Sequence, residues 1–464
     1  MADDTMPPAA ADGQDFHRFL SRYRAEHPED VLVVSEEVSG DQDITAVVTQ
    51  LAAEGRDPLL MFERVAGLAT PVVTNVFASR TRIARLFGVE PTQIHAAYQA
   101  RSRRRVAPQL VETGPILDDV EQGNIDLATL PLIKHFQTDR SPYITNSVII
   151  AEHPDTGIGN MSYHRSMPHS KTELATSLHS RGDLWRLLQI AIERKQPMPV
   201  AMVIGAHPLF MLAASARLPF DVDERDVAGG LFGEPMKVVR TPRYGIRVPA
   251  FAEIVLEGVI DPAARVDEGP FGEFTGYSSD RSTNNLLKVG AILRRKDAIL
   301  VDVVGGHSAE HLNLARIPRE SEMAEKLRER FPSVTALHYP NSGTHFHAYV
   351  ALKQMRAGEA RQVMLGLLGW DPYLKTVIAV DPDVDVTRDE DVLWALATHF
   401  QPHRDLLMVE GLPGSALDPS ASAAGTTSRM GLDATRGPGF EGIRATIEPR
   451  AVQRAAELLA GLRR

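Results

Sequence analysis

Two acidic residues on one short segment, Glu268 and Glu273, have the clearest capacity for proton transfer in this sequence. Pro270 fixes its own φ, and Gly269 and Gly272 allow backbone conformations that other residues avoid, so the segment can bring both acids to one site. Two neighbouring carboxylates do not both ionise easily, and the pKa of one therefore rises until it holds a proton near neutrality. A general acid needs that property. A surface turn with two solvated acids is the alternative, and local chemistry alone favours it.

A second polar cluster, Asn160-Met-Ser-Tyr-His-Arg165, follows a glycine turn after a predicted strand. An arginine beside a pair of carboxylates would hold one acid ionised and leave the other to accept or donate the proton. The alternative is a strand edge with scattered polar side chains.

The third cluster, Asp223-Glu-Arg-Asp226, is a charge run of the kind that begins many solvated helices. The apolar, glycine-rich stretch after it, 227–233, indicates burial instead.

Several familiar kinds of site are missing from the sequence. There is no cysteine, which excludes disulfides, zinc–thiolate sites, iron–sulfur clusters and a thiol nucleophile. The 16 histidines include no H-E-x-x-H spacing, and neither G-x-S-x-G nor G-x-G-x-x-G occurs. His345 and His347 are expected on one face of a strand, where they could bind a metal or simply form a satisfied pair.

Length and composition indicate a globular protein of two or three domains, because 464 residues exceed one simple core. The net charge of −10 argues against a nucleic-acid binder, which needs a basic face. No apolar run approaches the roughly 18 residues of a membrane helix. The acidic N-terminus, 1–13, lacks the features of a signal peptide and is expected to be a frayed tail. We expect a cytoplasmic protein that binds neither nucleic acid nor membrane.

The elements that must position these clusters fall into three sections. Helix and strand patterns alternate up to about residue 110, strands dominate after residue 116, and the alternation returns from about residue 312. The expected strands are 31–34, 59–62, 72–77, 147–150, 200–204, 237–240, 252–256, 286–293, 298–304, 344–353 and 375–380. The expected helices are 16–26, 79–88, 183–194, 207–217, 318–331, 355–367, 387–396 and 451–462.

Two local patterns near the C-terminus carry further predictions. Thr387-Arg-Asp-Glu390 has the spacing of a capping box that opens a helix. Residues 411–437 are rich in Gly, Ser, Ala, Pro and Thr, which predicts a long loop, either functional or a simple linker.

In this order along the chain, the clusters resemble the UbiD family of reversible decarboxylases, which use prenylated flavin mononucleotide (prenylated FMN). The likeness covers nearly the whole chain after the N-terminal tail, and the ordered set is far more specific than any one motif. It reverses the preference for the alternatives given above. The matching segments are Asn160-x-x-Tyr-His-Arg165, Asp223-Glu224 leading into Ala-Gly-Gly-Leu-Phe-Gly-Glu-Pro, Ala252-Glu-Ile-Val-Leu-Glu-Gly258, Glu268-Gly-Pro-Phe-Gly-Glu-Phe-Thr-Gly-Tyr277 and Ser428-Arg-Met-Gly-Leu-Asp-Ala-Thr435.

The resemblance implies a mixed α+β fold in four parts. These are an N-terminal α/β domain (14–115), a central split β-barrel that holds the flavin (116–310), a C-terminal α/β domain used in self-association (311–440) and a C-terminal helix (441–464). It also implies a homodimer or higher homo-oligomer, with the cofactor supplied by a separate flavin prenyltransferase.

The resemblance further implies prenylated FMN with Mn²⁺ (or Mg²⁺) and K⁺ near its phosphate, and hard oxygen ligands suit such ions. Asn160 and Glu224 would bind the metal, and His179 is the nearest imidazole for a third ligand. Arg181 and Gly182 look like the flavin-contacting version of that stretch. Arg429 stands where the family usually carries Lys, and either side chain can reach a phosphate. The remaining flavin-binding positions are Tyr163, His164, Arg165, Ser177 and Leu178.

The mechanism implied by the resemblance is a covalent adduct between prenylated FMN and an unsaturated or (hetero)aromatic acid, followed by loss of carbon dioxide. Glu273 would then protonate the remaining carbon, while Arg165 and Glu268 orient the carboxylate and tune Glu273. The flavin carries the difficult chemistry, and the protein provides placement and the proton. A small aromatic or heteroaromatic acid is favoured over an acrylic acid, because Phe274 and the histidines at 307–311 suit ring contacts. Two other classes stay open: a non-catalytic flavin-binding or maturation partner, and a flavin-free metal-dependent hydrolase.

Overall fold

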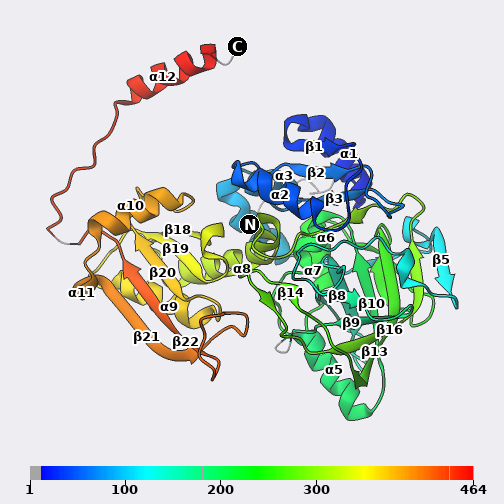
Figure 1. Ribbon diagram of the computed structural model, residues 1–464. Helices are drawn as coiled ribbons and strands as arrows, with labels where there is room; N and C mark the ends of the chain where they lie inside the picture. Colours follow the sequence, from blue (N-terminus) through cyan, green and yellow to red (C-terminus); the bar gives the residue numbers. More distant parts are fainter. Residues whose placement is uncertain (1–11, 180–181, 438, 463–464) are drawn as a thin grey trace.

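The computed structural model describes residues 12–179, 182–437 and 439–462. Figure 1 shows a larger lobe built from the N-terminal and central parts of the chain and a smaller C-terminal lobe beside it. Most of the expected N-terminal tail lies outside the described residues. No helix in the described ranges is both long and apolar enough to cross a membrane.

The N-terminal part forms a four-stranded sheet in the order β1-β2-β3-β17. Its helices begin and end on local signals: Asp15 caps α1 by accepting from the His17 amide, and Ser79 caps α3, which Gly88 closes at φ +66°. The strands are β1 (Val31–Val34), β2 (Leu59–Phe62) and β3 (Val72–Thr74), with β17 (Leu300–Val301) from later in the chain. The helices are α1 (Phe16–Glu26), α2 (Asp43–Ala53), α3 (Arg80–Phe87) and α4 (Ile94–Ser102).

The central part is a curled antiparallel sheet in the order β7-β6-β10-β13-β16-β9-β8, with β5 also paired to β16. Its strands are β5 (Asp119–Gln122), β6 (Ser147–Glu152), β7 (Gly159–Tyr163), β8 (Ser166–Pro168), β9 (Glu173–Thr176), β10 (Met198–Ile204), β13 (Ile254–Arg265) and β16 (Asn285–Arg294). Its helices are α5 (Asp183–Arg194), α6 (Pro208–Ala213) and α7 (Glu224–Phe232). Short strands accompany them: β4 (Gln109–Leu110), β11 (Lys237–Arg240), β12 (Arg247–Pro249), β14 (Phe271–Gly272) and β15 (Ser278–Ser279).

The C-terminal lobe holds a five-stranded sheet in the order β18-β19-β20-β22-β21. Its strands are β18 (Val334–His338), β19 (His347–Leu352), β20 (Thr376–Val380), β21 (Leu406–Pro413) and β22 (Thr426–Asp433). The helices are α8 (Ala309–Arg330), α9 (Glu359–Trp370), α10 (Asp389–His399), α11 (Pro402–Asp405) and α12 (Pro449–Leu462). Figure 1 shows α12 standing away from the body on an extended segment.

The hydrophobic cores follow the two lobes. Two cores mix side chains of the N-terminal and central parts, so these parts are packed as one body. Alternate residues of β19 and β20 enter two other cores, because successive side chains of a strand point to opposite faces. Helix α8 joins the lobes: Leu314 and Ile317 pack into the larger lobe, and Met323 and Leu327 into the smaller one.

The predicted mixed fold, with its α/β, β and α/β sections, is confirmed. The predicted domain boundaries stay a prediction. Strand 298–304 is only two residues long and joins the N-terminal sheet. Helix α8 begins at Ala309, not at Pro318, because Ser308 caps it by accepting from the His311 amide at 3.1 Å.

Two C-terminal predictions do not hold as stated. The segment 411–437 is only partly a loop: β21 extends to Pro413, β22 (Thr426–Asp433) pairs with both β20 and β21, and residues 414–425 form the loop between β21 and β22. The capping box at Thr387 does not form: the Thr387 amide donates to Asp385 at 2.9 Å, and Arg388 precedes α10 without a side-chain cap. The predicted histidine pair is also not on one strand, since His345 lies in the turn before β19.

Candidate active site

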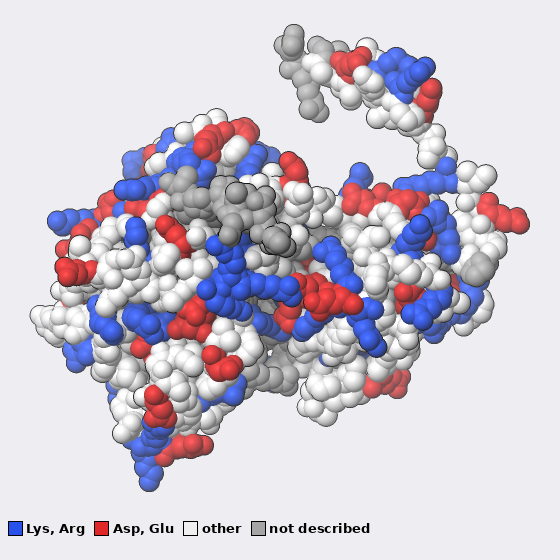
Figure 2. Space-filling view, turned by 180° about the vertical axis from the view of Figure 1, so that it is seen from behind, with Lys and Arg blue, Asp and Glu red and all other residues white. Residues whose placement is uncertain are grey.

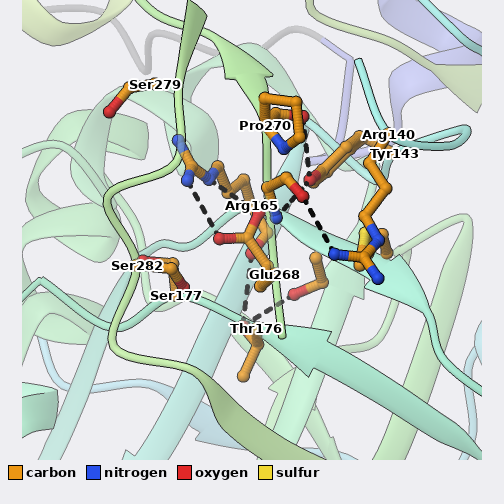
Figure 3. A network of polar contacts seen from close by, with 12 residues as sticks. Arg140, Tyr143, Arg165, Thr176, Ser177, Glu268, Pro270, Ser279 and Ser282 are labelled. Atoms are coloured by element: carbon orange, nitrogen blue, oxygen red, sulfur yellow. Dashed lines mark hydrogen bonds and ion pairs between the residues drawn. The ribbon is translucent and has the colours of Figure 1, made fainter. Parts of the chain in front are cut away.

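Arg165 connects the two acids of the segment from Glu268 to Glu273. It lies between β7 and β8, and its Nε and Nη2 donate to the two carboxylate oxygens of Glu268, both at 2.9 Å. Its Nη1 donates to Glu273, while Nη2 also reaches the Arg281 carbonyl at 3.0 Å. Figure 3 shows Arg165 and Glu268 facing each other at the centre of this network. Both acids are buried, at 4% and 8% exposure.

Burial and neighbouring charges favour one protonation state of Glu273. Burial raises the pKa of Glu273, and the charge of Glu268 raises it further against the opposing effect of Arg165. Burial alone would lower the pKa of Arg165, but Glu273 and Glu268 raise it, so the guanidinium stays charged. The site therefore holds one fixed cation beside a carboxyl group whose protonated form is favoured. That is the arrangement a general acid needs.

The backbone around the two acids depends on glycine at one point. Gly269 has φ +99°, a conformation that side chains disfavour, and its amide donates to the Tyr143 hydroxyl at 3.1 Å. Burial and the nearby Glu268 raise the pKa of Tyr143, so its hydroxyl stays neutral. Sequence reasoning missed Tyr143, because no local pattern connects it with a loop 126 residues later.

A second buried pair joins β7 to the first turn of α7. The Asn160 amide nitrogen donates to Glu224 Oε1 at 2.8 Å, and the Met161 amide donates to Glu224 Oε2 at 3.1 Å. Asp223 caps α7 by accepting from the Arg225 amide at 2.9 Å, and it also accepts from the Gly159 amide at 2.9 Å. The helix start is thus buried, as the stretch 227–233 indicated.

This pair fits a hard cation. The Asn160 Oδ1 atom is buried without a hydrogen-bond partner among the described residues. Burial raises the pKa of Glu224 to about 8, which is the cost of a buried carboxylate with no cation beside it. An amide oxygen and a carboxylate are oxygen ligands that suit Mn²⁺ or Mg²⁺. Within the described ranges, no three His, Cys, Asp or Glu residues form a metal-binding group, so a third such ligand is not identified.

The other predicted site residues are distributed as follows. His179 is exposed, with its Nε2 atom 3.4 Å from the Tyr373 hydroxyl, and its carbonyl accepts from the Gly182 amide at 2.9 Å. The predicted flavin contact Arg181 lies outside the described residues. Arg429 is buried in the smaller lobe, where its guanidinium donates to backbone carbonyls, including that of Asp371 at 3.0 Å. The structure does not bring Arg429 to the other site residues, and its proposed role stays a prediction.

The predicted flavin contacts lie at the ends of β7 and β9, where His164 and Ser177 are in contact. His164 bonds through its two ring nitrogens to the Ser177 carbonyl at 3.0 Å and the Ser162 hydroxyl at 2.9 Å. Burial lowers its pKa to about 4, so the ring is neutral. The Tyr163 hydroxyl donates to the Met211 carbonyl at 3.1 Å, and the Leu178 amide donates to Thr283 at 2.7 Å.

Comparison with known proteins identifies the family of this chain. Three models of 3-octaprenyl-4-hydroxybenzoate carboxy-lyase match in order: the N-terminal domain at 23–101, the Rift-related domain at 109–308 and the C-terminal domain at 312–434. The chain belongs to the UbiD family. It is therefore a carboxy-lyase of the UbiD class, rather than a non-catalytic partner or a flavin-free hydrolase.

Similar proteins cover nearly the whole chain. Anhydromevalonate phosphate decarboxylase of Methanothermobacter thermautotrophicus is 32% identical over 409 residues, which are 88% of this chain and 94% of the relative. The solved UbiD-class enzyme HmfF of Pelotomaculum thermopropionicum, in complex with FMN, is 31% identical with a TM-score of 0.89, over 95% of this chain and 99% of that one. Vanillic acid decarboxylase of Sedimentibacter hydroxybenzoicus, in open form, is 29% identical with a TM-score of 0.83, over 97% and 98%.

Proposed function

We propose that this UbiD enzyme catalyses the reversible, non-oxidative decarboxylation of an unsaturated or (hetero)aromatic acid with prenylated FMN. The observation that carries the proposal is the single guanidinium of Arg165 shared by two buried acids. The burial of Glu273 favours its protonated form, which a proton donor needs. FMN bound by the similar enzyme HmfF supports the choice of cofactor.

Prenylated FMN, when bound, supplies the electron sink that allows the bond between the substrate and its carboxylate carbon to break. The residues that would hold it are Tyr163, His164, Ser177, Leu178 and Gly182, with Arg181 and Arg429 as further phosphate or ring contacts. Asn160 and Glu224 would hold Mn²⁺ or Mg²⁺ beside the phosphate, with K⁺ nearby, and His179 is the proposed third ligand. The unpartnered Asn160 oxygen supports the metal site.

The roles of the chain's own residues follow from charge and geometry. Arg165 keeps a fixed positive charge where the substrate carboxylate must be oriented, and Glu268 fixes the orientation of that planar guanidinium by accepting from its Nε and Nη2 atoms. Glu273 donates its proton to the carbon that has lost carbon dioxide, and it takes the proton back in the reverse direction. Burial of Glu268 and Glu273 keeps water from competing for that proton.

The proposal is tested with the full chain produced together with a flavin prenyltransferase and supplied with Mn²⁺ and K⁺. Pyrrole-, furan-, indole-, benzoic- and cinnamic-type acids are incubated with it, and carbon dioxide release is measured. We expect release from at least one acid class, and only from protein that shows the absorption of bound flavin. Equal release from protein made without any flavin would contradict the proposal.

An aromatic ring is the favoured substrate class because of the wall beside Glu273. Phe274 is 6% exposed, and its ring centroid lies 4.5 Å from that of His345 and 6.1 Å from that of Tyr373. Rings on this wall would offer a flat apolar surface to a substrate ring.

A phosphorylated unsaturated acid is the second candidate, since anhydromevalonate phosphate decarboxylases are among the similar proteins. Arg319 is 4% exposed and 5.1 Å from the Tyr373 ring centroid, and its Nη2 atom has no hydrogen-bond partner among the described residues. A phosphate monoester would satisfy that nitrogen. This candidate predicts that an acid with a phosphate is turned over with a lower KM than the same acid without it. It also predicts that Arg319→Gln removes the difference.

A further inference from the structure

A segment far from the motifs lies against the loop that carries the two acids. We call residues 135–143 the clamp segment. Asp139 is 3% exposed, and its two carboxylate oxygens accept from two different amides: Gly272 at 2.9 Å and Phe136 at 3.0 Å. Two acceptor oxygens are the role of an ionised carboxylate. Asp139 thereby connects the start of the clamp segment to the residue immediately before Glu273.

Other residues of the clamp segment form hydrogen bonds with further backbone groups of the same loop. The Arg140 amide donates to the Pro270 carbonyl at 3.0 Å, and its Nη1 atom donates to the Gly269 carbonyl at 3.4 Å. Tyr143 accepts from the Gly269 amide, as described above. Figure 3 shows Arg140, Tyr143 and Pro270 together beside Glu268. Gly269, Pro270 and Gly272 therefore each form a backbone hydrogen bond with the clamp segment, and the bond from Gly272 to Asp139 is the one nearest Glu273.

Close packing leaves the loop little freedom to find another position. A Cβ atom added to Gly272 would lie 2.5 Å from the Phe136 ring, and one added to Gly306 would lie 2.6 Å from it. The Phe136 ring is thus packed between Gly272 and Gly306, and the backbone amide of Phe136 is one of the two that donate to Asp139. Movement of Asp139 would therefore shift both the ring and the Gly272 amide.

We propose that Asp139 is a positioning residue for Glu273, because it fixes the amide of Gly272 and places a negative charge near the Glu273 carboxyl group. The proposal rests on the proposed function, in which Glu273 donates the proton. The loop geometry, however, can be tested without any turnover.

The negative charge of Asp139 changes the pKa of Glu273 in a known direction. The charged groups with the largest effects on the pKa of Glu273 are Arg165, Glu268 and Asp139. Burial has the largest effect on the pKa of Glu273 and raises it. Of the charged groups, Arg165 lowers this pKa, whereas Glu268 and Asp139 raise it. A neutral residue at position 139 therefore lowers the pKa of Glu273. Decarboxylation needs protonated Glu273, so the fall in activity at high pH should move to lower pH when the charge of Asp139 is removed.

The first measurement is residue-resolved hydrogen exchange on the full-length holoenzyme. We expect the Gly272 amide to be protected in the unmodified protein and to exchange about tenfold faster in Asp139→Asn, because asparagine is neutral, keeps one acceptor oxygen for two amides and turns an NH2 donor toward the other. The matched control is Asp267→Asn, the same chemical change at an exposed residue next to Glu268. It should leave the exchange of Gly272 unchanged.

The second measurement is the pH profile of kcat for the same two variants. The high-pH limb should move to lower pH in Asp139→Asn and stay in place in Asp267→Asn. An unprotected Gly272 amide in the unmodified protein would overturn the positioning role even if no variant folds. A protected amide with an unshifted pH limb in a folded, flavin-loaded Asp139→Asn would show a structural residue only. Normal protection with no turnover of any acid would overturn the proposed function and leave the geometry standing.

Discussion

At the scale of single residues, the site depends on the shape of one guanidinium. Arg165 uses two nitrogens for Glu268 and a third for Glu273. One side chain therefore fixes the positions of both acids and keeps a positive charge between them. A planar fork with five donors can do this, whereas an ammonium group is a single point charge. The geometry also explains why the two acids differ, since Glu268 is bound by two parallel hydrogen bonds and Glu273 by one.

The shape of Arg165 gives the first prediction. Arg165→Lys keeps the positive charge but loses the two-pronged bond to Glu268, so kcat/KM should fall about 100-fold from misplacement of the reacting groups. Steady-state kinetics on flavin-loaded protein measure this. Arg281→Lys is the control, because Arg281 contacts Arg165 only through its backbone carbonyl in the described contacts. Kinetics of Arg165→Lys equal to those of this control would show that charge alone is sufficient.

At the scale of elements, the metal pair depends on how closely β7 approaches α7. A Cβ atom on Gly159 would lie 2.1 Å from Nη2 and 2.5 Å from Cζ of Arg225. Arg225 is fully buried and bound to Asp223 and Glu152, so it cannot move aside freely. The glycine before Asn160 is therefore a packing requirement.

Gly159→Ala is the second prediction. It should destabilise the fold by about 1–3 kcal/mol through overpacking. It should also weaken Mn²⁺ binding, because β7 carries Asn160 away from Glu224. Thermal unfolding and a Mn²⁺ titration measure the two effects. Gly369→Ala, where a Cβ atom meets nothing within 4 Å, should be close to neutral in both. A Gly159→Ala variant that binds Mn²⁺ normally would contradict the account of the pair.

Local signals explain which elements the sequence could predict. The boundaries of α3 and α5 followed from caps and amphipathic spacing within each segment. The β21–β22 hairpin was missed because its pairing partner β20 lies some fifty residues earlier, and composition alone favoured a loop. The capping box at Thr387 failed because Asp385, just outside the pattern, binds the Thr387 amide and hydroxyl instead.

The same reasoning applies to the site. Arg165, Glu268 and Glu273 were predicted by ordered motifs, and the structure brings them together. Asp139 and Tyr143 carry no motif, and their contacts span more than 120 residues of sequence. Such contacts depend on the tertiary fold, which single-sequence patterns do not encode.

At the scale of the whole molecule, the site lies where the lobes meet. Phe274, the residue after Glu273, makes a tilted ring contact with His345 and an edge contact with Phe346 of the smaller lobe, and Tyr373 approaches His179 of the larger one. Figure 1 shows α8 running between the lobes and β14 on the side that faces the smaller lobe. Figure 2 shows acidic and basic side chains interspersed over the rear face of both lobes.

Self-association through the smaller lobe stays a prediction from the sequence; an evolved form of the similar enzyme HmfF is dimeric. Met408 and Met430 are paired across β21 and β22 and are 56% and 39% exposed, which leaves an apolar patch on the sheet. The third prediction is that Met408→Glu lowers the mass measured by light scattering toward the 50.9 kDa of one chain. Met355→Glu, at a methionine that is 71% exposed, is the control. An unchanged mass in Met408→Glu would place the interface elsewhere.

The central claim is that Glu273 delivers the proton, and decarboxylation in D2O tests it most directly. Glu273→Gln keeps an oxygen that can accept from Arg165 but has no acidic proton. The flavin-loaded unmodified enzyme should give product with one deuterium at the carbon that lost carbon dioxide. Glu273→Gln should bind the flavin with the same absorption spectrum and give no deuterated product. Undiminished turnover and deuterium incorporation in that variant would contradict the account.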